Sequence, residues 1–130
     1  MTKQIINPSS MASPTGYSHV ARKSGTPVFI SGQVALDGGG NVVGKGDPAA
    51  QAAQIFANLR TVVAAAGGTM DDIVKLNVYA LDVGYRPVIA EARAAAFPDG
   101  QFPASTFVVI SGLAAPDFLI EIEAVAMIDG

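Results

Sequence analysis

Residues 118–128 read FLIEIEAVAMI, and this closing stretch decides the fold. The apolar residues Ile120, Ile122 and Ala124 alternate with Glu121 and Glu123, which is the two-residue period of a β-strand. One face of the predicted strand is therefore apolar and should pack beneath helices. The opposite face mixes carboxylates with apolar side chains, and we expect it to lie partly against another subunit and partly along a cleft.

Other segments carry the pattern of strands as well. Residues 27–31 are β-branched and aromatic, so they predict a strand that bends at Gly32 and continues over 33–36. A further strand is expected over 102–111. Residues 71–82 alternate in polarity and predict a strand. The side chains expected on its core face are Val74, Leu76, Val78 and Ala80.

Two segments have the helical period. Asp47 supplies a capping carboxylate, Pro48 suits the first helical position, and Gly67 ends the pattern. A shorter Ala-rich helix is predicted over 87–97, ended by Pro98. The resulting order, β-β-α-β-α-β-β, predicts an α+β fold with two helices against one sheet.

Length and composition indicate a single domain over residues 1–130, in which residues 1–15 form an N-terminal arm rich in Ser and Pro towards its end. Half of the residues are hydrophobic and only 15% are charged, so we expect some apolar surface to be buried between subunits. The net charge of -3, with no basic run, disfavours nucleic-acid binding.

Several chemistries are excluded by residue type. The chain has no cysteine, and its single histidine, His19, cannot build a multi-histidine metal site. No nucleotide-binding or hydrolase motif is present, and no cofactor is expected. We expect no secretory signal and no bilayer-spanning segment, and hence a cytoplasmic protein.

A family resemblance becomes specific when short pieces are taken in order. Each piece alone is weak, but together they have the order and spacing of the RidA (YjgF-type) reactive-intermediate deaminase family. The resemblance extends from about Gly16 onward. The pieces are Gly16-Tyr17-Ser18-His19, Val28-Phe29-Ile30-Ser31-Gly32-Gln33, Asn58-Leu59, Ala66-Gly67, Met70-Asp71-Asp72-Ile73-Val74-Lys75, Val78-Tyr79-Ala80-Leu81-Asp82, Phe102-Pro103-Ala104 and Ile120-Glu121-Ile122-Glu123-Ala124-Val125-Ala126.

This resemblance implies a chorismate-mutase-like fold with one mixed sheet, assembled as a homotrimer with small-molecule clefts between neighbouring subunits. It also implies cofactor-free hydrolysis of reactive enamines and imines such as 2-aminoacrylate. Glu121 would then position or activate water, because water addition to an imine carbon needs proton transfer. The substrate-binding residues implied by position are Tyr17, Ser31, Gly32, Ser105 and Thr106.

One position departs from the family pattern. The deaminases that the chain resembles carry an arginine directly after the Pro-Ala pair, where it grips the substrate carboxylate, and this chain has Ser105 there. A hydroxyl cannot replace a bidentate cation, so simple 2-imino acids are expected to bind poorly. An asparagine common on the second helix of the family corresponds to Ala90. Arg86 and Arg93 are the basic residues of that helix that could reach the cleft.

Two kinds of function remain open on the sequence. The chain is either an enzyme that hydrolyses or tautomerises an enamine or imine with altered specificity, or a non-catalytic trimer that binds a metabolite or regulates a partner. RNA cleavage fits poorly with the negative charge. Structural roles are the alternatives for single residues: an inter-subunit contact for Glu121 and Glu123, a buried aromatic for Tyr17. We expect a structural role for His19.

Overall fold

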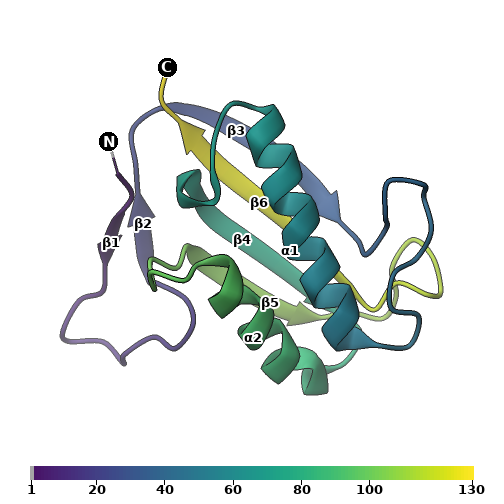
Figure 1. Ribbon diagram of the computed structural model, residues 1–130. Helices are drawn as coiled ribbons and strands as arrows, with labels where there is room; N and C mark the ends of the chain where they lie inside the picture. The colour runs from purple at the N-terminus through teal and green to yellow at the C-terminus, as the bar shows by residue number, and fades with distance from the viewer. Residues whose placement is uncertain (1) are drawn as a thin grey trace.

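The computed structural model describes residues 2–130 and has two helices packed on one side of a four-stranded sheet (Figure 1). The strands are β1 (Gln4–Ile6), β2 (Val20–Arg22), β3 (Thr26–Gln33), β4 (Ile73–Ala80), β5 (Ala104–Val109) and β6 (Ile120–Ile128). The helices are α1 (Pro48–Ala65) and α2 (Arg86–Ala96), with single 3₁₀ turns η1 (Met70–Asp72) and η2 (Val83–Tyr85). This α+β architecture confirms the fold class that the sequence predicts.

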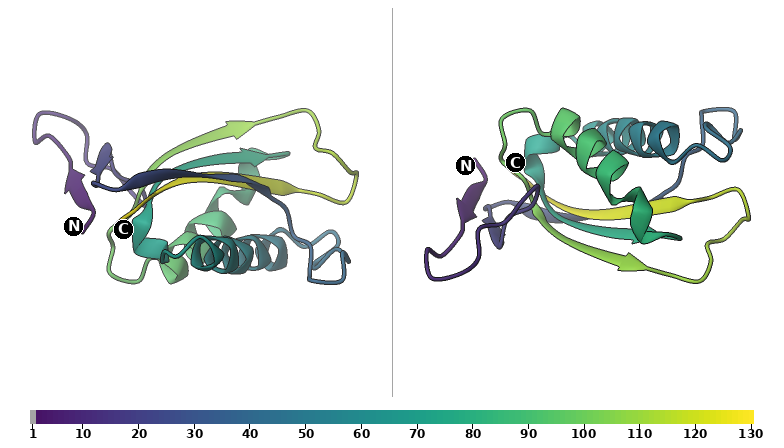
Figure 2. Two further views of the ribbon diagram at one scale, coloured as in Figure 1. Left: turned by 90° about the horizontal axis from the view of Figure 1, so that it is seen from above. Right: turned by 90° about the horizontal axis from the view of Figure 1, so that it is seen from below.

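The main sheet has the order β3-β6-β4-β5 and is mixed. Strand β6 pairs antiparallel with both β3 and β4, whereas β4 and β5 run parallel. The closing strand therefore lies inside the sheet. Figure 2 shows that α1 and α2 cover one face of this sheet, and no helix formed by residues 2–130 covers the other. We call these the covered face and the open face.

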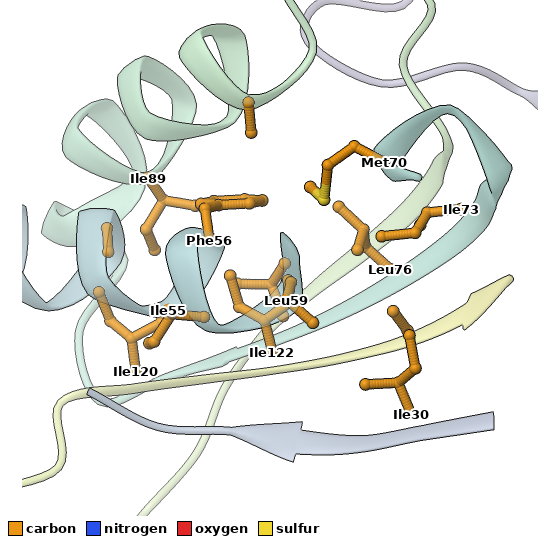
Figure 3. Packing of buried hydrophobic residues seen from close by; sticks show 14 of the residues in the cluster. Ile30, Ile55, Phe56, Leu59, Met70, Ile73, Leu76, Ile89, Ile120 and Ile122 are labelled. Atoms are coloured by element: carbon orange, nitrogen blue, oxygen red, sulfur yellow. The ribbon is translucent and has the colours of Figure 1, made fainter. Parts of the chain in front are cut away.

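The alternation in β6 produces the two faces. Ile120, Ile122 and Ala126 are fully buried under the helices, while Glu121 and Glu123 are half-buried on the open face. Figure 3 shows the covered face, where isoleucine and leucine side chains from the strands meet those from α1 and α2. Burial of a side chain of this size contributes about 1.5–3 kcal/mol, so this layer sets most of the stability.

Helix α1 begins and ends where its sequence signals lie. The side chain of Asp47 accepts a hydrogen bond from the backbone N–H of Ala50 at 3.1 Å, and Pro48 occupies the first helical position. Gly67 follows the helix with a φ of +90°, a conformation in which glycine carries no Cβ penalty. All three predicted signals are confirmed.

Several predicted element boundaries need correction. The strand expected to continue over 33–36 ends at Gln33, and the closing strand expected from residue 118 begins at Ile120. The strand expected over 71–82 begins only at Ile73, because Asp72 accepts a hydrogen bond from the N–H of Thr69 at 2.8 Å and closes a 3₁₀ turn. An irregular register between Ile73 and Lys75 turns Ile73 to the core in place of Val74. The strand expected over 102–111 is shorter, Ala104–Val109.

The N-terminal arm contains a strand that the sequence pattern misses. Strand β1 pairs antiparallel with β2 in a separate two-stranded sheet. Three residues are too few to display a period, so no pattern could reveal β1. Lys3, just before β1, fixes the arm to the main body: its Nζ donates to the carbonyl oxygen of Ile73 at 3.1 Å and lies 5.0 Å from the centre of the Phe97 ring.

The open face carries apolar as well as polar side chains. Phe29 on β3 is 79% exposed and Val108 on β5 is 40% exposed, and both alternate with residues of the covered face. Burial of this surface between subunits stays a prediction. Within residues 2–130, no helix is long and apolar enough to cross a membrane.

Candidate functional site

A cavity of about 150 Å³ lies between α2, β5 and the end of the N-terminal arm; we call it the α2 cavity. Its lining residues come from three separate parts of the chain, and they are Thr15, Tyr17, Arg86, Ile89, Arg93, Ser105 and Phe107. Two of the predicted substrate-binding residues, Tyr17 and Ser105, are thus brought together. The volume suits a ligand of a few non-hydrogen atoms, because one water occupies about 30 Å³ in the liquid.

Tyr17 reaches this cavity because its neighbour Ser18 is tied to the chain just before β5. Ser18 is only 3% exposed, and its Oγ donates to the carbonyl oxygen of Phe102 at 2.6 Å. The backbone N–H of Ser18 also donates to the carbonyl oxygen of Pro103 at 3.2 Å. Ser18, which lies inside the family motif Gly16-Tyr17-Ser18-His19, therefore anchors this motif to the chain before β5.

His19 has the structural role that the sequence predicts. Its Nε2 lies 2.9 Å from the carbonyl oxygen of Ala12, which accepts a hydrogen bond from the ring. Its backbone N–H donates to the side chain of Asn7, and its ring packs edge-on against Tyr17. These contacts shape the loop that carries Tyr17.

The two arginines of α2 both line the α2 cavity. Arg86 is exposed, and its guanidinium carbon lies 5.7 Å from the centre of the Phe107 ring. Arg93 is half-buried, and its terminal nitrogen Nη2 lies against Gly16. Desolvation lowers the pKa of Arg93, and the nearby positive charge of Arg86 lowers it further.

A second group of predicted site residues, Gly32 and Glu121, lies toward the opposite edge of the sheet, where β6 meets β3. The register of β3 shifts between Ile30 and Gln33, which confirms the predicted bend at Gly32. A Cβ at Gly32 would overlap Oε2 of Glu121. Glycine is therefore needed here so that the carboxylate can approach the backbone.

Glu121 and Glu123 differ in their partners. Oε1 of Glu123 accepts hydrogen bonds from the hydroxyl of Tyr79 at 2.5 Å and from Nδ2 of Asn77 at 3.1 Å. The hydrogen bond to Glu123 raises the pKa of Tyr79, as do burial and the charge of Glu121. These two partners belong to the same chain, and the expected inter-subunit contact of Glu123 stays a prediction.

Glu121, by contrast, makes no hydrogen bond and no ion pair with any residue from 2 to 130. It is half-buried on the open face beside a carboxylate that is already bound by two donors. Of the two glutamates in the closing strand, Glu121 is thus the one with a carboxylate available to a ligand.

A single chain does not bring all of the predicted site residues together. Gly32 lies in β3 and Ser105 in β5, which are the two edge strands, with β6 and β4 between them. Ser105 pairs in register with the buried Leu76 and faces the helices, whereas Glu121 faces the open side. Strands lie about 4.8 Å apart, so β3 and β5 are separated by about 14 Å.

Two other predicted residues lie outside the α2 cavity. Thr106 follows Ser105 and therefore points to the open face, where its Oγ1 accepts a hydrogen bond from Nζ of Lys75 at 2.8 Å. Ser31 is exposed, and its carbonyl oxygen accepts a hydrogen bond from the side chain of Gln33. No group of three or more metal-ligating side chains occurs within the described part of the chain.

Comparisons with known proteins agree with this architecture. Residues 8–128 match the family model described as Endoribonuclease L-PSP. The chain is 34% identical over 126 residues to the 3-aminoacrylate deaminase RutC of Acinetobacter baylyi, covering 97% of this chain and 98% of that protein.

Solved structures give the same result. A protein of unknown function of the conserved Rid family from Yersinia pestis is 36% identical and superposes with a TM-score of 0.92, covering 98% of this chain and 100% of that one. RidA of an Antarctic Psychrobacter is 32% identical with a TM-score of 0.73, covering 98% and 99% of the two chains. The chain therefore belongs to the Endoribonuclease L-PSP family, the RidA (YjgF-type) family whose motifs its sequence carries in order.

Proposed function

We propose that this protein hydrolyses a small enamine or imine to a carbonyl compound and ammonia, in a cleft that neighbouring subunits of a homotrimer complete. The relative from Acinetobacter named 3-aminoacrylate deaminase supports this reaction class at 34% identity. The observation that carries the proposal is the half-buried carboxylate of Glu121, held against Gly32 without a partner within residues 2–130.

The topology of the sheet supports the proposal of a subunit cleft. The α2 cavity lies beside the edge strand β5, and Glu121 lies near the edge strand β3. A second copy that sets its β3 edge beside the β5 edge of the first would bring the two groups of site residues together. The exposed Phe29 on β3 and Val108 on β5 give such a contact an apolar surface to bury.

The chemistry that Glu121 would perform is proton transfer. For 3-aminoacrylate, protonation of C2 converts the enamine to an imine, and water then adds to C3. The resulting carbinolamine loses ammonia and leaves 3-oxopropanoate, so that one water and one proton are consumed and one ammonium is released. A carboxylate near the reacting carbon can take the proton of the water and return it to the leaving amine.

The substitution at Ser105 leads us to propose a specificity that differs from that of the deaminases of 2-imino acids. In 2-aminoacrylate the carboxylate is bonded to the carbon that water attacks, whereas in 3-aminoacrylate one further carbon separates them. Ser105 offers a hydroxyl and no cation at the place where those deaminases hold the carboxylate. A substrate whose acid group lies farther from the reacting carbon suits this arrangement better.

Turnover of 3-aminoacrylate and 2-aminoacrylate, each generated in the assay, tests the proposal against the spontaneous rate. We expect faster ammonia release from 3-aminoacrylate and a loss of about 100-fold or more in Glu121→Gln, since general acid–base catalysis contributes about 10² to 10⁴. Thermal unfolding checks that the variant is folded. Rapid turnover of 2-aminoacrylate would refute the altered specificity, and wild-type activity in Glu121→Gln would refute the catalytic role.

The second candidate is a trimeric module that binds a metabolite without converting it, and Ser105 favours it because an anchor for the substrate has been lost at that position. A thermal-shift screen with small amines, oxo acids and aldehydes separates the two candidates. A compound that stabilises the protein and is recovered unchanged, with no imine turned over, supports the binding module.

A further inference from the structure

The α2 cavity has a surplus of positive charge. Its lining includes the guanidinium groups of Arg86 and Arg93 and no aspartate or glutamate. Neither arginine forms an ion pair with any residue from 2 to 130. The two positions are seven residues apart, or about two helical turns, so both side chains extend from the same side of α2.

The burial of Arg93 makes this unpaired positive charge destabilising for the folded protein. Its Nε atom is buried and has no hydrogen-bond partner among the described residues. A buried donor of a charged group that lacks a partner destabilises the folded protein. Natural proteins keep such groups where a ligand or a partner supplies the acceptor.

The surroundings of both arginines hold their side chains in place. A Cβ at Gly16 would lie 2.7 Å from Nη2 of Arg93, and Gly16 has a φ of +74°, so glycine provides both the turn and the space. Arg86 lies over the ring of Phe107, where its planar group is oriented by the aromatic face. Two oriented guanidinium groups form a receptor for a planar acid group.

We propose that the α2 cavity binds the carboxylate of the substrate through Arg93, with Arg86 as a second, more exposed cation. The anchor comes from α2 instead of β5, and the small side chain of Ser105 leaves the cavity open to the acid group. This inference rests on the proposed function, since it assigns the substrate of that reaction to small carboxylic acids. An acidic side chain of a neighbouring copy is the competing occupant.

Binding of a stable acid tests the anchor without turnover. The probe is 3-hydroxypropanoate, which resembles the carbinolamine but has no amino group to lose, and its matched control is the uncharged 3-hydroxypropanamide. Titrations followed by ¹H–¹⁵N spectra of the full chain report the dissociation constant and the Nε–H signal of Arg93. The variants are Arg93→Gln, Arg86→Gln and, as a matched control, Arg60→Gln, which removes an exposed arginine of α1 outside the cavity.

We expect the acid to bind more tightly than the amide and to shift the Nε–H signal of Arg93. The dissociation constant should rise at least about tenfold in Arg93→Gln, less in Arg86→Gln because that side chain is exposed, and not at all in Arg60→Gln. Equal binding of acid and amide, or unchanged affinity in Arg93→Gln, would overturn the inference.

The oligomeric mass of each variant, measured by light scattering, distinguishes a bound substrate from an acidic side chain of a neighbouring copy. If the wild type does not bind the acid and Arg93→Gln changes the mass of the assembly, Arg93 serves a subunit contact and the inference fails. If acid binding depends on Arg93 but no imine is turned over, the role of Arg93 as carboxylate anchor is supported and the proposed reaction is refuted. If turnover is the same in Arg93→Gln as in the wild type, the proposed reaction is supported and the role of Arg93 as carboxylate anchor is refuted.

Discussion

The covered and open faces of the sheet are built from the same strands but follow different rules. On the covered face, Ile120, Ile122 and Leu76 are fully buried, and shape and apolarity decide which residues fit. On the open face, Glu121 and Glu123 are neighbours in the same strand but differ in their contacts. Glu121 has no hydrogen bond or ion pair within residues 2–130, whereas Glu123 accepts hydrogen bonds from two donors. One strand thus carries the buried apolar layer on one side and the proposed catalytic carboxylate on the other.

The largest expected effect is on the covered face. Ile122→Ala should lower the free energy of unfolding by about 2–5 kcal/mol, because it leaves a cavity beneath α1, whereas Val125→Ala on the open face should cost about 1 kcal/mol or less. Urea unfolding at equilibrium measures both variants. Equal losses would show that the open face is buried as deeply as the covered face in the assembled protein.

The next effect concerns the approach of Glu121 to the backbone. Gly32→Ala places a methyl group where Oε2 of Glu121 lies, so the carboxylate must move, and we expect turnover to fall about 100-fold. Gly38→Ala is the matched control, because a Cβ there meets no atom within 4 Å and the backbone has no positive φ. If both variants turn over substrate equally, the position of Glu121 does not matter to the reaction.

A smaller effect is expected where Glu123 is held. Tyr79→Phe removes the hydroxyl that donates to Oε1 of Glu123 and should lower the urea midpoint, leaving Asn77 as the remaining donor. Tyr85→Phe is the control, since its hydroxyl has no hydrogen bond within residues 2–130. A midpoint unchanged in Tyr79→Phe would mean that water replaces the hydroxyl at no cost.

A pH dependence is expected where the N-terminal arm meets the covered layer. Desolvation lowers the pKa of Lys3 to about 8, against the opposing charges of Asp71 and Asp72. The unfolded chain then binds more protons than the folded one between about pH 8 and the ordinary value of about 10.4, so stability rises with pH in this window.

Lys3→Met tests this assignment by comparison with the wild type. We measure the free energy of unfolding of both proteins in urea at each pH. Between pH 8 and pH 10, the value for the wild type should rise relative to the value for Lys3→Met. A constant difference between the two proteins would show that Lys3 has an ordinary pKa in the folded state.

Local sequence signals predicted the elements well where the pattern was long or the cap was specific. Asp47, Pro48 and Gly67 bound α1 as expected, and the alternation of β6 correctly assigned both of its faces. The errors lie at β1, which is only three residues long, and at the start of β4, where the strand register is irregular. A three-residue strand and a register shift are set by the partner strand, which sequence periodicity does not contain.

The candidate site was predicted less completely, because it combines parts that are distant in the sequence. Ser105 was expected beside Thr106, yet adjacent residues of a strand point to opposite faces, and only Ser105 lines the α2 cavity. Tyr17 reaches that cavity through the contacts of Ser18 with the chain before β5. Such contacts depend on how the arm packs, which no local pattern reveals.

The sequence by itself determined the class of fold, the family, and the presence of a carboxylate at Glu121 without an arginine at position 105, because these depend on residue identity and local period. Only the tertiary structure decided that Glu121 is unpaired within residues 2–130, that Glu123 is bound by Tyr79, and that Arg93 enters the cavity beside Ser105. The reason is that charge, burial and hydrogen bonding are properties of neighbours in space, and those neighbours come from distant parts of the chain.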